Sequence, residues 1–569
     1  MKKMISLILC TILLTGFLGA CQSNAPEETG TTSTAENTNQ TDQGADQDES
    51  SAMDFSQHET FSLWLISDPN DYYSDYSENP IVRMLNEKFN VTLEYQQPAT
   101  GTEADSLSLM FGTGEYTDLV DLSTYTGSVT ELYTDGVIID ISQYLDYMPH
   151  LKNLLDTDEV YRKACYNDNG QILTLLSYTT NDDLAWGGMV YRRDILETMT
   201  DGNIQFPSGN DIPTTIDDWD YMLPLYVEYF ESQGLKEYAG LILPSEGYFV
   251  MGEIASGFGG PSSYYVEDGV VKHGVFEDGF YHYLQKMNEW YEKGYIYQDF
   301  ASRTNDMFIM PNTALTYGGA AGIWYGLQAQ LGDAMSVPDS GLYFDVQPVT
   351  SPIDTANGVT IARGFNATPK NTSGMNGSAI TTACENIPRL LSVLDYMYSE
   401  EGGMYFSGLT KEQGADTDPI YAKAGLQDGT YWFDENGEFV YNPLITYVGG
   451  TISIEPFGSN RIPSRRNNTY LLGNSSDILK YADEIWMGSK ESNQGSVPPI
   501  SYSPEDEITI KDNDTKISDY LRTSIPKFIM GTMPLDDDAW AEFKGQLVSL
   551  GLEENLEIRQ EAYERYLNR

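Results

Sequence analysis

Residues 22–53 contain no Val, Ile, Leu, Phe, Tyr or Trp, and no Lys or Arg. Thr, Ser, Asn, Gln, Glu and Asp make up most of this segment, with scattered Gly and Ala. It can bury too little apolar surface to offset the entropy lost on ordering its backbone, so we expect it to stay disordered. Folding must therefore begin after it. As a flexible coil, the segment would hold the folded body on the order of 30 Å from its own first residue.

An apolar run precedes this polar segment. Lys2 and Lys3 lead it, residues 5–14 have few polar interruptions, and Leu18-Gly19-Ala20-Cys21 closes it. A basic start, a short apolar stretch and a small-residue end are typical of a secretory signal. The run is also short for a hydrocarbon layer of roughly 30 Å. The closing tetrapeptide resembles a bacterial lipobox, which implies cleavage before Cys21 and lipid on its thiol; a plain secretory signal is the alternative.

Length and charge limit the classes of protein that this chain can be. It has 569 residues, 40% of them hydrophobic, and a single core usually stops growing beyond about 250–300 residues, so we expect at least two lobes. The net charge of −53 argues against a nucleic-acid partner, whose phosphates need Lys and Arg. It also argues against flat binding to anionic lipid. Most of the acidic residues are expected on a solvated surface.

Neither the cysteines nor the histidines predict a metal centre. Cys165 and Cys384 are the cysteines of the folded body, and the sequence alone does not decide whether they form a disulfide. The four histidines are not spaced like a zinc pair. The acidic stretches at 68–71 and 434–436 lack the glycine and closing glutamate of an EF-hand loop and are interpreted as turns. We therefore expect no cofactor and no metal, although a structural calcium ion stays open.

The first part of the body predicts a parallel sheet. Residues 61–66 form an apolar strand, Asn79 caps a helix that has Pro80 at its first position, and residues 91–95 form the next strand. Strand, helix and strand at this spacing predict a right-handed crossover unit. A further strand is expected at 118–122. Ligands of such sheets sit beyond the carboxyl ends of the strands, so the loops after Ile66 and Leu122 are candidate walls of a site.

Later patterns predict a second lobe and further helices. Phe280, Leu284, Met287 and Tyr291 define an amphipathic helix that ends at Gly294. Further expectations are a small-residue turn over 318–325, a helix over 388–401 stopped by Gly402, an apolar helical stripe from Trp540 to Leu550, and a kink or a shortened helix at Pro224.

An ordered series of motifs resembles one known family. The motifs lie at residues 133–140, 148–150, 169–173, 189–196, 212–219, 425–438, 525–531, 534–540 and 561–566. In this order they resemble the extracellular solute-binding proteins of family 1, the lipid-anchored receptors of carbohydrate importers, and in particular the large Gram-positive lipoproteins. Each motif alone is weak, but the series extends to the last residues of the chain.

The resemblance implies an α/β fold with two lobes of the periplasmic-binding-protein type (type II), and a ligand cleft between them. The expected divisions are a signal at 1–20, a tether at 21–55, lobe 1 at 56–185 and 351–410, and lobe 2 at 186–350 and 411–569. It also implies a monomer at the outer face of the cytoplasmic membrane, anchored by lipid on Cys21. The lobes would close by hinge rotation on a carbohydrate and present it to the permease subunits of an ABC transporter.

The candidate site residues are those that suit a sugar. A sugar offers apolar faces and a rim of hydroxyls, which call for flat rings together with carboxylates, amides and an arginine. Loops expected to face the cleft supply this mixture. The predicted ligand contacts are Trp64, Asp68, Tyr72, Tyr125, Asp182, Asp183, Trp186, Glu246, Tyr248, Arg303, Trp324, Tyr325 and Trp432.

No catalytic residue is predicted, because the sequence contains no nucleophile elbow and no glycine-rich phosphate loop. Two alternatives stay open. A polysaccharide-cleaving enzyme needs only two carboxylates across a cleft, which a chain with 85 acidic residues can always offer. A surface glycan adhesin would bind the same ligand without a permease. A solute other than a sugar is also compatible with this scaffold.

Overall fold

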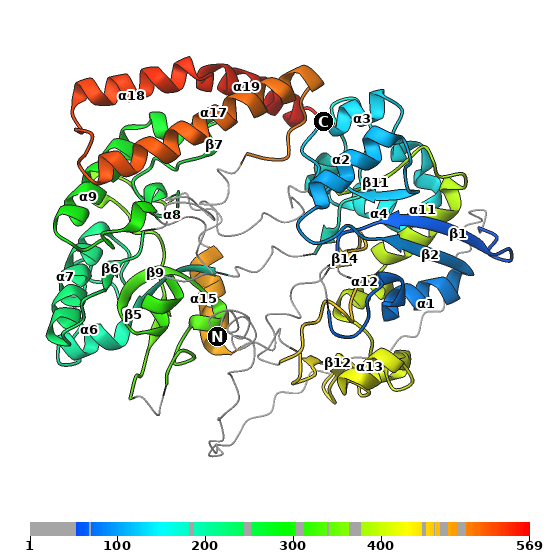
Figure 1. The fold of residues 1–569 in the computed structure, drawn as a ribbon, viewed down its shortest axis with the longest axis horizontal. Coiled ribbons are helices and arrows are strands. Elements are labelled where there is room, and N and C mark those ends of the chain that lie inside the picture. Colours follow the sequence, from blue (N-terminus) through cyan, green and yellow to red (C-terminus); the bar gives the residue numbers. More distant parts are fainter. Residues whose placement is uncertain are drawn as a thin grey trace, which may run out of the picture.

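The computed structural model describes residues 53–67, 70–180, 187–243, 252–302, 312–337, 341–362, 377–445, 451–459, 461–466, 476–487 and 497–569. The signal and Cys21 therefore lie outside the described residues. The described chain forms two lobes, and the last helices extend along one of them toward the other (Figure 1). Each lobe has its own sheet and its own apolar core, as expected from the length of the chain.

Lobe 1 is built on a sheet in the order β11-β3-β1-β2, formed by β1 (Glu59–Trp64), β2 (Val91–Gln96), β3 (Leu119–Asp121) and β11 (Ser378–Ile380). Strand β1 is parallel to both β2 and β3, which confirms the predicted parallel arrangement. Strand β11 comes from much later in the chain and runs antiparallel to β3. The carboxyl ends of β1 and β3 consequently meet the amino end of β11 at one edge of the sheet.

Helix α1 (Pro80–Phe89) shows why the first crossover forms where the sequence predicts it. The side chain of Asn79 accepts hydrogen bonds from the backbone N–H groups of Ile81 (2.8 Å) and Val82 (3.3 Å), and Pro80 occupies the first turn, where no backbone donor is needed. Ile81 and Leu85 are buried in the lobe 1 core. The helix ends at Asn90, which adopts a left-handed conformation and turns the chain into β2.

The remaining elements of lobe 1 cover this sheet and extend it. They are α2 (Glu103–Thr113), α3 (Val129–Thr134), α4 (Pro149–Thr157), α5 (Glu159–Cys165), β4 (Tyr178–Thr179), α11 (Ile387–Asp395), α12 (Glu400–Met404), α13 (Pro419–Ala424), β12 (Tyr431–Phe433), β13 (Phe439–Tyr441) and β14 (Arg465–Arg466).

The packing of two segments differs from the expected divisions. Core residues from Leu409 to Ile462 pack with lobe 1, although residues from 411 onward were expected in lobe 2. Ile353 exchanges backbone hydrogen bonds with the start of α7 (Ile216–Ser232) in lobe 2, although residue 351 was expected to open the return to lobe 1. Apolar periodicity marks an element as buried but carries no information about which core receives it.

Lobe 2 contains a mixed sheet in the order β10-β5-β9-β6, formed by β5 (Gly187–Arg192), β6 (Ala239–Leu241), β9 (Ala321–Leu327) and β10 (Val346–Pro348). Around it lie α6 (Arg193–Met199), α7, α8 (Gly252–Ser256), α9 (Asp278–Glu292), α10 (Asn312–Tyr317), α15 (Asp477–Met487) and the hairpin of β7 (Tyr264–Glu267) and β8 (Val270–His273). The predicted helix around Phe280 is confirmed as α9.

Three local predictions need correction. At Pro224 we expect a kink or a shortened helix, and the shortened helix is wrong, since α7 continues through that residue. Residues 321–325 belong to strand β9 and not to a turn, because they are a fully buried strand between β5 and β6. The helix expected over 388–401 ends as α11 at Asp395, and Gly402 lies inside α12 rather than stopping a helix.

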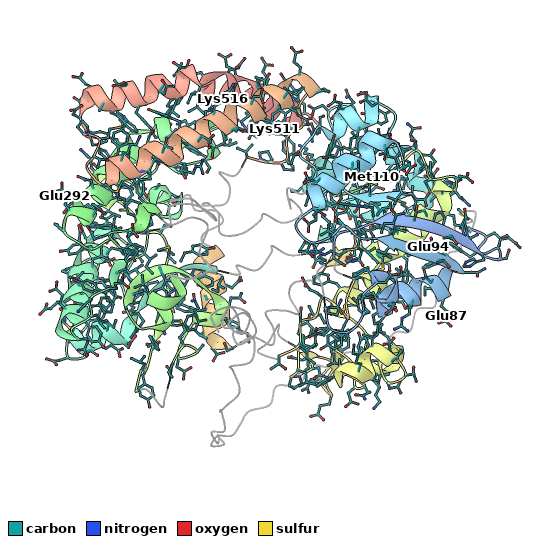
Figure 2. All side chains as sticks on the ribbon, viewed as in Figure 1. Glu87, Glu94, Met110, Glu292, Lys511 and Lys516 are labelled. Carbon is teal, nitrogen blue, oxygen red and sulfur yellow. The ribbon has the colours of Figure 1, made fainter. Side chains whose placement is uncertain are left out.

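Helices α17 (Pro504–Ile529), α18 (Asp537–Ser549) and α19 (Leu552–Leu567) close the fold. Their apolar side chains, among them Phe528, Trp540 and Leu552, pack in the core of lobe 2. The predicted stripe before Gly551 is confirmed as α18. These helices also reach lobe 1, since the ammonium of Lys511 on α17 donates a hydrogen bond of 2.6 Å to the carbonyl of Thr126 (Figure 2).

The end of α19 is fixed to lobe 1 by a cluster that we call the arginine latch, formed by Arg565, Arg569 and Asp168. Both guanidinium groups donate to the Asp168 carboxylate, at 2.8 and 2.7 Å. Arg569 also donates to the carbonyls of Lys163 (2.9 Å) and Tyr166 (2.8 Å). Its side chain is only 5% exposed. A buried guanidinium with several acceptors is a strong, directional contact, so the latch connects the two lobes.

The described surface agrees with an acidic protein in water. Exposed carboxylates such as Glu87, Glu94 and Glu292 lie on the outer faces of both lobes (Figure 2). Cys165 and Cys384 are free thiols. Among the described residues, no helix has the length and apolar character needed to cross a membrane.

The arginine latch predicts a large stability difference between two arginines of the C-terminal helices. Arg569→Ala removes one of the two donors to Asp168 and the shared donor of two partly buried carbonyls, so the free energy of unfolding should fall by about 2–3 kcal/mol. Arg522→Ala removes an exposed pair with Asp519 on α17 and should cost less than about 1 kcal/mol. Chemical denaturation measures both changes. Equal losses in the two variants would contradict a structural role for the latch.

Candidate functional site

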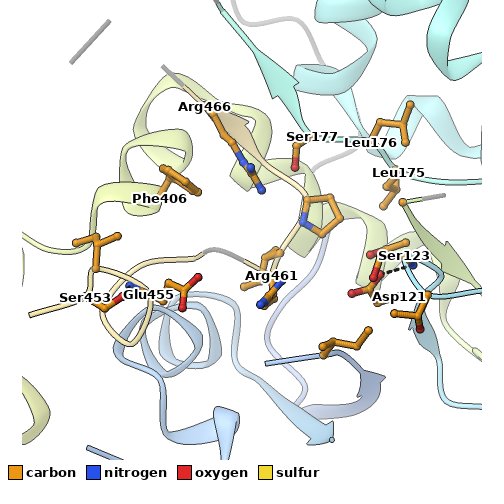
Figure 3. Close-up of a pocket in the computed structure, with 17 residues that line it drawn as sticks. Asp121, Ser123, Leu175, Leu176, Ser177, Phe406, Ser453, Glu455, Arg461 and Arg466 are labelled. Atoms are coloured by element: carbon orange, nitrogen blue, oxygen red, sulfur yellow. Dashed lines mark hydrogen bonds between the residues drawn. The ribbon is translucent and has the colours of Figure 1, made fainter. Parts of the chain in front are cut away.

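A cavity of about 760 Å³ lies at the edge of the lobe 1 sheet where the strand ends meet (Figure 3). Ile66 follows the end of β1, and Ser123 and Thr124 follow the end of β3, so the two loops predicted as walls both line it. The full lining is Ile66, Asp121, Ser123, Thr124, Leu175, Leu176, Ser177, Gly377, Ser378, Phe406, Ser453, Ile454, Glu455, Arg461, Ile462, Pro463 and Arg466.

The wall formed by β3 and β11 is held by backbone contacts. The side chain of Asp121 accepts a hydrogen bond of 2.8 Å from the N–H of Ser123, which turns the chain at the strand end. The carbonyl of Gly377 accepts from Leu122 at 2.9 Å. Gly377 has a φ of +64°, and a Cβ there would lie 2.6 Å from the carbonyl oxygen of Leu175. Only glycine at this position therefore lets the chain before β11 pass so close to the backbone of Leu175.

Thr124 offers a buried hydroxyl to this cavity. Its Oγ1 atom has no hydrogen-bond partner among the described residues. A buried hydroxyl without a partner is unfavourable by about 1–3 kcal/mol. Thr124 lines the cavity, so a rotation of this side chain would bring the hydroxyl to a polar group of a bound molecule.

The opposite wall comes from a distant part of the chain. Strand β14 pairs in parallel with β4, and successive side chains of a strand point to opposite sides. Arg465 forms an ion pair of 3.3 Å with Glu400, outside the cavity. Arg466 lines the cavity and stacks on the ring of Phe406, with 4.7 Å between its Cζ atom and the ring centroid.

The loop that carries Glu455 and Arg461 is anchored to the start of α1. The amide nitrogen of Asn79 donates to the carbonyls of Pro456 (3.2 Å) and Gly458 (3.1 Å). The hydroxyl of Tyr73 donates to the Pro456 carbonyl at 2.9 Å. Burial raises the pKa of Tyr73 to about 12, so this hydroxyl keeps its proton at neutral pH.

A second cavity of about 860 Å³ adjoins the loop after β1 and is more polar in its lining. Ser67, Asn70, Tyr72 and Gln97 contribute to it, together with Lys423, whose ammonium donates to the carbonyls of Asp71 (2.5 Å) and Tyr72 (3.2 Å). The side chain of Asn70 accepts from the N–H groups of Tyr72 and Tyr73, which forms the turn expected in this stretch.

The predicted aromatic contacts that lie in the described residues are not gathered in one place. Tyr72 lines the second cavity, and Tyr125 packs edge-on against Phe111, with 5.3 Å between the ring centroids. Trp64 is 5% exposed and lies in the lobe 1 interior. Trp432 lines a third cavity, of about 420 Å³, with Gln413.

In lobe 2, Trp324 and Tyr325 are buried strand residues and present almost no surface to a ligand. The indole of Trp324 is 1% exposed and donates a hydrogen bond of 3.1 Å to the side chain of Gln330. The other predicted contacts lie outside the described residues; they are Asp68, Asp182, Asp183, Trp186, Glu246, Tyr248 and Arg303.

Sequence reasoning did not identify Phe406, Arg461 and Arg466. These residues come from segments with no motif, and only the packing of lobe 1 brings them to the strand ends. One signal was available, namely the adjacent Arg465 and Arg466 in a chain with only 32 basic residues.

Metal binding finds no support in the described ranges, where no three His, Cys, Asp or Glu side chains are grouped to hold an ion. Asp434 instead accepts hydrogen bonds from the N–H groups of Asn436 (2.8 Å) and Glu438 (2.9 Å). These bonds shape the turn between β12 and β13, as expected for that stretch.

The two lobes and the cavity at the strand ends define an α/β binding protein. Residues 81–374 match the family model described as bacterial extracellular solute-binding protein, and the chain belongs to this family. The resemblance seen in the sequence is thereby confirmed. Membership places the chain among proteins that bind solutes rather than among enzymes. No curated protein sequence matches the chain.

Solved structures with the same fold cover most of the chain. An HMO-binding, ABC-transporter-associated solute-binding protein from Bifidobacterium longum infantis is 17% identical, with 89% of this chain and 99% of that chain covered and a TM-score of 0.67. The S. pneumoniae substrate-binding protein FusA with fructo-nystose is 18% identical, with 90% and 99% covered and a TM-score of 0.64. The alginate-binding protein AlgQ2 is 17% identical, with 89% and 98% covered and a TM-score of 0.63.

Thr124 allows a test of the cavity in the ligand-free protein. Thr124→Val removes a hydroxyl that has no partner among the described residues, so the free energy of unfolding should stay the same or rise by up to about 1 kcal/mol. Thr117→Val is the matched control, because its buried hydroxyl donates a 2.8 Å bond to the carbonyl of Leu119, and it should lose about 1–2 kcal/mol. Chemical denaturation compares the two. A Thr124→Val variant as unstable as the control would show that the hydroxyl is already bonded.

Proposed function

We propose that this protein is the substrate-binding component of an ABC importer for carbohydrates and that it binds an oligosaccharide in the cavity at the lobe 1 strand ends. The observation that carries the proposal is the composition of this cavity. The hydroxyl-bearing residues Ser123, Thr124 and Ser177 line it together with apolar side chains and Phe406. A saccharide needs both kinds of contact, because its hydroxyls require partners and its C–H faces pack on apolar groups.

The proteins of similar fold support a saccharide as the ligand class. The Bifidobacterium protein is described as binding HMO, the S. pneumoniae protein is in complex with fructo-nystose, and AlgQ2 is described as binding alginate. Two of them are described as associated with, or part of, ABC transporters.

Lobe 2 would supply the other side of the site. The predicted contacts Asp182, Asp183, Trp186, Glu246, Tyr248 and Arg303 belong to segments next to its described elements. The lobes would close on the ligand by rotation, and the closed form would dock on the permease as a monomer. Binding of about −8 kcal/mol, equivalent to a micromolar dissociation constant, suits a receptor that must also release its ligand.

The N-terminal region would place this receptor at the outer face of the cytoplasmic membrane. Cleavage before Cys21 and lipidation of its thiol would anchor the chain, and residues 21–55 would form the flexible tether. A single lipid chain binds a membrane only weakly, so more than one acyl chain is required for a stable anchor.

A ligand panel tests the proposed function. Titration calorimetry of the mature chain with kestose, milk oligosaccharides and plant oligosaccharides should give a dissociation constant near micromolar for one class. Chromatography of the same mixtures should recover the sugar unchanged, and small-angle scattering should show a smaller radius of gyration when the sugar is bound. Cleavage of the sugar would favour the enzyme, and binding without compaction would favour the adhesin.

The ring of Phe406 should contribute to affinity. Phe406→Ala removes the apolar platform of the cavity and should weaken saccharide binding about tenfold, since ring contacts contribute about 0.5–1.5 kcal/mol. Phe433→Ala is the control, because this ring is 50% exposed and lines the third cavity instead. Calorimetry with the ligand found in the panel measures both variants. Equal affinities in Phe406→Ala and the unmodified protein would place the sugar elsewhere.

A further inference from the structure

We infer that the saccharide bound in the lobe 1 cavity is acidic and that Arg466, assisted by Arg461, binds its carboxylate. The inference rests on the proposed function, because it assumes that this cavity is the saccharide site. It adds the chemical class of the sugar, namely one that contains a uronic acid or a similar carboxylate-bearing unit.

The distribution of charge is the first observation. Acidic residues outnumber basic ones by 85 to 32 in the whole chain. The cavity lining contains two arginines and two acidic residues, Asp121 and Glu455, so basic groups are not outnumbered there. A lining of the same size with the composition of the chain would hold two or three acidic residues and one basic residue. The lining therefore carries about one arginine more than composition predicts, and its charges balance although the chain as a whole is acidic.

The second observation is the geometry of Arg466. Its guanidinium lies against the ring of Phe406, with Cζ 4.7 Å from the centroid, and this contact restricts how the side chain can turn. Strand pairing of β14 with β4 fixes the backbone from which it projects. The N–H donors of a guanidinium lie in its own plane, so a group that stacks on a ring still directs them sideways. A carboxylate in that plane can accept two parallel hydrogen bonds.

The third observation is that a second guanidinium approaches the same space. Figure 3 shows Arg461 and Arg466 among the residues that line the cavity, at the two ends of the segment 461–466. The nearby carboxylate of Asp121 accepts the backbone N–H of Ser123 and so has a structural task in the β3 turn. Two arginines on one cavity distinguish a charged sugar from a neutral one more strongly than hydroxyls do.

The acidic surface does not oppose this assignment. Charges on exposed surfaces are screened over about 8 Å at physiological ionic strength, so the net charge of the chain acts weakly on a ligand that has already entered the cavity. Contact with the arginines then determines the preference. The expected consequence is selectivity for the charge itself, independent of the sugar skeleton.

The experiment compares acidic oligosaccharides with their own methyl esters, which keep the skeleton and remove the charge. The mature chain is titrated calorimetrically with oligogalacturonate, oligoalginate and glucuronoxylan fragments, each as acid and as ester, and with neutral oligosaccharides. We expect one acidic series to bind at least about tenfold more tightly than its ester. Arg466→Gln should remove this preference, and Arg466→Lys should restore part of it.

Arg465→Gln is the matched control, because Arg465 is the adjacent residue of the same strand and pairs with Glu400 outside the cavity. It should keep the full preference for the acid. Thermal unfolding of the ligand-free variants shows that Arg466→Gln is folded if its midpoint matches that of Arg465→Gln.

The outcomes separate the inference from the proposed function. Tight binding of a neutral oligosaccharide with no preference for any acid over its ester would overturn the inference and leave the proposed function standing. A preference for the acid that survives in Arg466→Gln would also overturn the assignment of Arg466. If no saccharide of either kind binds, the proposed function fails, and the inference fails with it.

Discussion

The buried side chain of Asn79 is the contact on which the described cavity depends. It is fully buried, and every polar atom of its amide is used. The oxygen caps the first turn of α1, and the nitrogen donates to the carbonyls of Pro456 and Gly458, almost 380 residues further along the chain. An unpaired amide in this position would be costly, so α1 and the distant loop are ordered together. The loop carries Glu455 and continues toward Arg461, so one buried amide couples the first crossover of lobe 1 to the far wall of the cavity.

The features predicted correctly from the sequence are those whose cause is local. Asn79 and Pro80 determine where α1 starts, and alternation of apolar residues places β1 and β2, so no distant contact is needed to find them. The corrected features have distant causes. Residues 318–322 look like a turn because they are all Gly or Ala, yet Ala321 and Gly322 begin strand β9, which lies between β5 and β6. Gly402 was expected to stop a helix, but it lies within α12, where a Cβ would lie 1.9 Å from the carbonyl oxygen of Tyr396.

The predictions for the candidate site also divide into features with a local cause and features with a distant one. The rule that ligands sit beyond strand ends located the loops after Ile66 and Leu122, because chain direction alone decides which ends meet. The choice of aromatic side chains was less informative. Trp64 and Trp324 have the size and shape of sugar platforms, but such side chains also fill protein cores, and sequence pattern does not separate the two uses. Phe406 and Arg466 come into contact only in the folded lobe 1, and no spacing in the sequence predicts this contact.

The arginine latch has a geometric consequence for the two lobes. Helix α19 is packed into one lobe, while the side chain of Arg569 is inserted into the other. If the latch stays intact, the two lobes keep one point in common when they move. Any relative movement of the lobes is then a rotation about the latch and not a translation. In such a rotation, the displacement of a residue grows with its distance from the latch. The rim farthest from the end of α19 would widen the most, and the rim beside it would hardly change.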